Sequence, residues 1–130
     1  MKTNYTFGSF IKEKRLKTGI SLRKFSEQVG ISPVYLSNLE NDRMTAPKDE
    51  VVSNIAKLLL LNETDTTTLY DLAAKTKSNV VVSQDLPDYI MERDIVRIAL
   101  RTAKEVDATD EEWQEFIACL EARKKKNQEG

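Results

Sequence analysis

Histidine is absent from this 130-residue sequence, and cysteine occurs only once. Without histidine, the chain lacks the side chain that most often serves as a general base and as a metal ligand. The lone cysteine, Cys119, can neither close an intramolecular disulfide nor form a zinc-binding pair. The sequence also contains no GxxxxGK[ST] or GxGxxG phosphate-binding loop. These absences argue against an enzyme, and we expect no cofactor and no metal.

Glycine and proline are scarce, with four and three residues, whereas charged residues make up 32% of the chain. This composition is typical of a soluble, largely helical protein with one domain, or with one small domain and an appendage. The longest apolar run, the leucines at 58–61, is far too short to cross a membrane. The N-terminal sequence MKTNYTFGSF lacks the apolar segment of a signal peptide. Together with the single cysteine, this predicts a cytoplasmic protein.

Charge is distributed unevenly along the chain. Residues 1–61 contain ten Lys/Arg and six Asp/Glu, a net charge of +4. Residues 62–130 contain ten Lys/Arg and fifteen Asp/Glu, a net charge of −5. A basic first half suits a nucleic-acid-binding head, and an acidic second half suits a segment with another task.

Residues 22–41, LRKFSEQVGISPVYLSNLEN, have the spacing of a helix-turn-helix unit. Ser26 is the small residue where the two helices come closest, and Gly30 allows the positive φ of a tight turn. Ser32 is placed to cap the second helix, and Pro33 occupies its first turn. The positions where the helices touch are apolar: Phe25, Val29, Ile31, Leu36 and Leu39. Helical hairpins with a glycine also occur in ordinary cores, but the joint match favours DNA binding.

Apolar periodicity predicts further helices on both sides of this unit. Five short helices are expected around one core in residues 6–75. Residues 78–86 have a strand-like composition, which we interpret as a packed linker, with an edge strand as the alternative. A long helix is expected from Pro87 to about Val106, and a last helix from Thr109, where Glu112 completes a capping box.

The segment 7–61 resembles the Cro and phage-repressor type of helix-turn-helix domain, often called the XRE family. The resemblance is carried by KEKRLKTGISLRKFSEQVGISPVYLSNLEN and by APKDEVVSNIAKLL. It implies an all-α, five-helix lambda-repressor-like DNA-binding domain, and the apolar periodicity described above adds a two-helix extension after it. The expected boundaries are residues 1–76 for the domain, 77–86 for the linker and 87–130 for the extension.

The resemblance also implies roles for individual residues. Arg15 and Glu40 are expected to form a structural ion pair that docks the first helix on the recognition helix, residues 32–40. Contacts with bases are expected from Ser32, Pro33, Val34, Ser37 and Asn38. Contacts with phosphates are expected from Arg23, Tyr35, Arg43 and Lys48. For the basic residues of this set, a solvated surface charge is the alternative.

Two of the base-contacting positions differ in what they can read. The Asn38 amide can donate to and accept from adenine at once. Pro33 departs from a glutamine that is common in the family at this place. Its ring, like the Val34 side chain, can touch a thymine methyl but cannot form hydrogen bonds with a base. We therefore expect sparse direct readout and a larger share of shape readout.

The acidic C-terminal region carries an apolar stripe at i, i+3, i+4 and i+7, formed by Trp113, Phe116, Ile117 and Leu120. Three roles remain open for it: a homodimer interface, a cap on the chain's own core, or a surface for another protein. Dimerisation ranks ahead of a different partner, because one short recognition helix reads few base pairs. The sequence thus predicts a regulator, most simply a repressor that binds a palindromic double-stranded operator as a homodimer. The alternative is an antitoxin or similar regulator whose acidic helices bind a partner protein.

Overall fold

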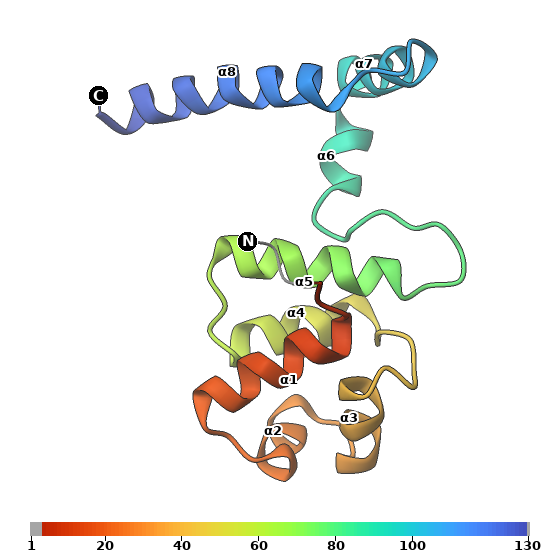
Figure 1. The fold of residues 1–130 in the computed structure, drawn as a ribbon, viewed down its shortest axis with the longest axis vertical. Helices are drawn as coiled ribbons and strands as arrows, with labels where there is room; N and C mark the ends of the chain where they lie inside the picture. The colour runs from red at the N-terminus through yellow and green to blue at the C-terminus, as the bar shows by residue number, and fades with distance from the viewer. Residues whose placement is uncertain (1–3, 130) are drawn as a thin grey trace. The chain divides into compact units, whose positions relative to one another are not determined.

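The computed structural model describes residues 4–129, and within this range the chain forms eight helices and no strand (Figure 1). The predicted all-α class is confirmed. The chain divides between Asp88 and Tyr89 into two compact units. The predicted domain boundaries at 76 and 87 stay a prediction. The helices are α1 Phe7–Thr18, α2 Leu22–Val29, α3 Pro33–Glu40, α4 Asp49–Leu58, α5 Glu63–Lys75, α6 Pro87–Glu92, α7 Asp94–Glu105 and α8 Asp110–Glu129.

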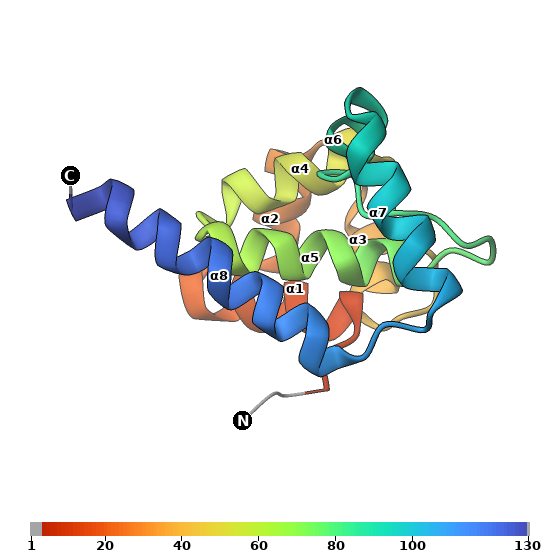
Figure 2. The same cartoon turned by 90° about the horizontal axis from the view of Figure 1, so that it is seen from above.

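The first unit is built from α1 to α5 around a single apolar core. In Figure 1, α2 and α3 lie together at one end of this unit, and α5 lies across α1 and α4 in the view of Figure 2. The fully buried large side chains come from all five helices: Phe7, Phe10, Phe25, Ile11, Leu36, Leu39, Ile55, Leu69 and Val52. Of the five apolar residues expected between α2 and α3, four are buried, and Ile31 packs against the core while partly exposed.

Local capping sets where these helices begin. Asn62 accepts a hydrogen bond from the Asp65 N–H at 2.7 Å and caps α5. Pro47 lies before α4, since that helix begins at Asp49 with Lys48 at the cap position. The five helices expected in this unit are therefore all present.

Residues 78–86 form no strand, and Ser83 and Gln84 attach this segment to α4 and α5. The Gln84 side chain accepts a hydrogen bond from the Ser53 hydroxyl at 2.7 Å and donates one to the Asp49 carbonyl at 3.1 Å. Ser83 is buried and donates to the Asp71 carboxylate. Val80, Val81 and Val82 are exposed, and the alternative of an edge strand is not seen in this segment.

Three helices, α6 to α8, follow residue 86, where two were expected. The predicted helix from 87 to 106 was wrong in one respect: it is broken into α6 and α7 at Arg93, which is extended with φ −127° and ψ 111°. Arg97 stabilises the break, because its Nη1 donates to the carbonyls of Ile90 at 2.9 Å and Met91 at 2.6 Å. No glycine or proline marks this position in the sequence.

The expected capping box is present at the start of α8. The Thr109 hydroxyl accepts from the Glu112 N–H at 3.2 Å, and Glu112 Oε1 accepts from the Thr109 N–H at 3.1 Å. Within the described residues, no helix is both long and apolar enough to span a membrane.

Candidate DNA-binding surface

The turn between α2 and α3 depends on Gly30 and Ser26. Gly30 has φ +88°, and its N–H donates to the Ser26 carbonyl at 2.9 Å. A side chain at this position would meet no neighbour, so the backbone conformation, and not space, requires glycine here. Ser26 is fully buried, and its hydroxyl donates to the Arg23 carbonyl at 2.7 Å, which satisfies its polar atom inside the interface. The two helices are thus fixed at one angle.

The N-terminal end of α3 projects into solvent. Ser32 caps the helix by accepting from the Tyr35 N–H at 3.1 Å, and Pro33 occupies the first turn, where its missing N–H costs nothing. Ser32 and Pro33 are exposed, and the Val34 side chain is 71% exposed. An exposed valine on a well-capped helix is available to contact an apolar group of a partner.

The second turn of α3 is less open. Ser37 and Asn38 are half-buried. The Asn41 amide donates to the Ser37 carbonyl at 2.8 Å and lies 3.5 Å from the Ser37 hydroxyl. The Asn38 carbonyl accepts from the Arg43 N–H at 2.9 Å, which ties the following loop to the helix. Of the five expected base-contacting residues, three are therefore exposed at the helix start and two are half-buried behind them.

A buried ion pair connects α1 with the end of α3. Arg15 Nε lies 2.7 Å from Glu40 Oε2, and Arg15 Nη2 lies 3.0 Å from Glu40 Oε1. The remaining Nη1 donates to the Ile20 carbonyl at 2.9 Å. The two side chains are 8% and 3% exposed. This bidentate geometry places both residues where the sequence expected a structural pair, and it leaves neither group available to a base.

A second connection between α1 and α3 was not expected from the sequence. Asp42, with φ +58°, follows α3 and turns its carboxylate onto the first turn of α1. Its Oδ1 accepts from the Gly8 N–H at 3.0 Å, and its Oδ2 accepts from the Thr6 hydroxyl at 2.6 Å. A Cβ on Gly8 would lie 2.2 Å from the Leu39 carbonyl oxygen, so the two backbones touch at Gly8. The one available signal was a glycine inside a predicted helix.

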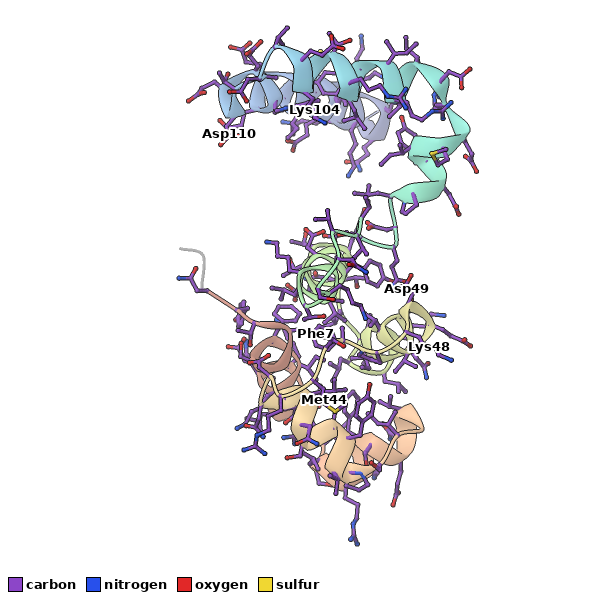
Figure 3. The ribbon with its side chains drawn as sticks, turned by 90° about the vertical axis from the view of Figure 1, so that its right-hand side faces the viewer. Phe7, Met44, Lys48, Asp49, Lys104 and Asp110 are labelled. Atoms are coloured by element: carbon purple, nitrogen blue, oxygen red, sulfur yellow. The ribbon has the colours of Figure 1, made fainter. Side chains whose placement is uncertain are left out.

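The residues expected to contact phosphates come from three different segments. Arg23 is exposed in the first turn of α2, Arg43 is exposed in the loop after α3, and Lys48 is exposed at the cap of α4 (Figure 3). Tyr35 is half-buried in α3. Within residues 4–129, no salt bridge occupies the three basic side chains. They are therefore free to pair with an external anion.

Comparison with known proteins decides the type of this domain. Residues 11–66 match a family model described as helix-turn-helix. The segment is an XRE-type helix-turn-helix domain. The match begins within α1, ends within α5 and contains all of α2, α3 and α4. This match supports a DNA-binding regulator.

A solved structure of a SinR protein/SinI protein complex is similar over 92% of this chain and 99% of that chain, with 22% sequence identity and a TM-score of 0.47. No curated protein matches the chain.

Proposed function

We propose that this chain is a cytoplasmic, sequence-specific repressor of transcription that binds a palindromic operator as a homodimer. The observation that carries the proposal is the contrast between the two ends of α3. Its start, at Ser32, Pro33 and Val34, is exposed, whereas its end is held by the buried pair of Arg15 and Glu40. A rigid helix with a free N-terminal end is what entry into a major groove requires.

Sequence readout is assigned to the exposed and half-buried residues of α3 and its cap. Asn38 forms the bidentate hydrogen bonds to an adenine, and Val34 and Pro33 contact thymine methyl groups. Ser32 and Ser37 add short hydroxyl contacts, with Ser37 sharing its hydroxyl with Asn41. Because few of these groups form hydrogen bonds with bases, the deformability of the operator contributes to specificity.

Affinity that does not depend on sequence is assigned to the basic residues around α3. Arg23, Arg43 and Lys48 are exposed and come from elements before and after the recognition helix. Together with the Tyr35 hydroxyl they bind phosphates on both sides of the groove. These contacts fix the position of α3 on the duplex, so that its side chains meet the bases.

Dimerisation is assigned to the second unit. Among residues 89–128 no side chain is buried, and the apolar Phe116, Ile117 and Leu120 are 54%, 50% and 45% exposed. Trp113 meets Phe116 edge to face, with ring centroids 6.2 Å apart. An apolar stripe of this size without cover within its unit favours an interface in which Trp113 and Phe116 are the anchors.

The same exposed stripe also supports a second candidate function, in which α8 binds a different protein, as an antitoxin does. Purification of the protein distinguishes the two functions. A repressor dimer needs no other chain, whereas a co-purifying partner held by residues 78–130 would favour the alternative.

Selection of bound duplexes from a random pool tests the repressor proposal. We expect the enriched site to contain two inverted half-sites whose centres lie about 10–10.5 base pairs, or a multiple, apart. The enriched site placed between a promoter and a reporter should lower transcription when the protein is present. Enrichment of a single, unrepeated half-site would contradict the palindromic dimer, and unchanged or raised transcription would contradict repression.

A further inference from the structure

The surface of α8 carries opposite charges at its two ends. Asp110, Glu111, Glu112 and Glu115 lie in its first half, and the basic run 123–126 lies near its end. The apolar stripe from Trp113 to Leu120 lies between them. Such a helix repels a parallel copy of itself, because acid meets acid and base meets base. It attracts an antiparallel copy, because each acidic end then meets a basic end.

Helical spacing separates the charges that border the stripe from those that do not. At 3.6 residues per turn, Asp110 and Glu112 flank the apolar face on its two sides. At the other end Arg123 flanks it, and Lys124 continues its line one turn after Leu120. The remaining charges of both clusters project from the opposite face: Glu111, Glu115, Lys125 and Lys126. All of these side chains are exposed. Two acidic and two basic residues therefore lie at or beside the apolar face, and two acidic and two basic residues lie on the opposite face.

A groove next to the basic end of α8 has a lining that is complementary to an acidic and apolar segment. It has a volume of about 650 Å³, and its lining includes the apolar Ile95, Val96 and Leu120 and the basic Arg93, Arg123 and Lys124. The start of α8 at Asp110 is labelled in Figure 3. It has the complementary chemistry, because Asp110 and Glu112 lie beside Trp113 there. A second copy of the chain supplies that segment.

We propose that α8 of a second copy packs antiparallel on α8, with its acidic first turns at the basic end of this groove. A two-fold axis near Ile117 then places Trp113 of each copy against Leu120 of the other. The same axis brings Asp110 opposite Lys124 and Glu112 opposite Arg123 across the interface. This inference rests on the dimer of the proposed function and assigns its orientation and register.

Charge exchange across the interface tests the pairing. One full-length variant carries Asp110→Lys with Glu112→Gln, in which glutamine keeps the capping box. The other carries Lys124→Glu with Arg123→Gln. Matched controls make the same charge changes on the opposite face, as Glu111→Lys with Glu115→Gln and as Lys125→Glu with Lys126→Gln. Analytical ultracentrifugation is done under a reducing agent because Cys119 is free and exposed, and circular dichroism checks helix content.

We expect the dimer dissociation constant to rise at least about tenfold in each of the two interface variants, because like charges then face each other twice. A one-to-one mixture of the two should recover dimers, since the lysine introduced at position 110 of one copy then faces the glutamate introduced at position 124 of the other. Both controls should remain dimeric. Interface variants that behave like the controls, or a mixture that stays monomeric, would overturn the antiparallel register but not the dimer. A wild-type protein that is monomeric throughout would overturn the dimer of the proposed function as well.

Discussion

The Asp42 carboxylate accepts a hydrogen bond from the Gly8 N–H at 3.0 Å, and so joins the segment that follows the recognition helix to the first turn of α1. The Arg15–Glu40 pair joins the same two helices further along α1. With two separate attachments, α3 cannot tilt on α1 without breaking one of them. The stiffness of the recognition helix thus depends on residues that do not face DNA.

Replacing Gly8 with alanine should destabilise the first unit by about 1–3 kcal/mol, as overpacking of a close contact does. The added Cβ would lie 2.2 Å from the Leu39 carbonyl oxygen and 2.7 Å from that of Glu40. Urea unfolding followed by circular dichroism measures the change. Lys12→Ala, at an exposed position of the same helix, is the control and should stay within about 0.5 kcal/mol of wild type. A Gly8→Ala protein as stable as this control would show that the two backbones separate at little cost.

Removing one partner of the buried ion pair should be more costly than removing both. Arg15→Ala strands the Glu40 carboxylate in the core, and we expect a loss of about 3–5 kcal/mol in unfolding free energy. The double variant Arg15→Met with Glu40→Leu should lose less, because no buried charge is left unpaired. The same urea titration compares them. Equal losses in the single and the double variant would contradict an unpaired charge as the cause.

Asn38→Ala should weaken binding to the selected operator by about 1–3 kcal/mol and leave binding to random duplexes nearly unchanged. The amide is expected to read a base, and a lost base contact matters only where that base is present. Fluorescence anisotropy on the two duplexes provides both affinities. An equal loss on both would remove Asn38 from the residues that read the sequence.

Arg43→Ala should weaken binding to all duplexes alike. Each lost phosphate contact should reduce the slope of log affinity against log salt by about one unit. The measurement is a salt titration of wild type and variant on one duplex. If the slopes coincide, Arg43 is a solvated surface charge and makes no phosphate contact.

Trp113→Ala should convert dimers into monomers, because Trp113 anchors the proposed interface from a unit separate from the DNA-binding one. Light scattering measures the mass, and circular dichroism shows that α1–α5 remain folded. A variant that remains dimeric would exclude the Trp113 stripe as the interface.

The parts of this fold that follow from local rules could be predicted from the sequence. Gly30 and Ser32 determine their turn and cap through their own backbone and neighbours, and the α2–α3 unit lies where the pattern placed it. The break at Arg93 could not be predicted. It is stabilised by hydrogen bonds from the Arg97 side chain to the end of α6, and no glycine or proline marks its place in the sequence. The contact of Asp42 with Gly8 spans 34 residues and has no periodic pattern, so only the folded chain reveals it.

The central claim is that this protein reads a DNA sequence through α3. Fluorescence anisotropy on the DNA upstream of its own gene and on a scrambled duplex, at two salt concentrations, tests this most directly. We predict tight binding to the upstream DNA, much weaker binding to the scrambled duplex, and a steep loss of affinity with salt on both. Weak binding that does not distinguish the two duplexes would contradict the account.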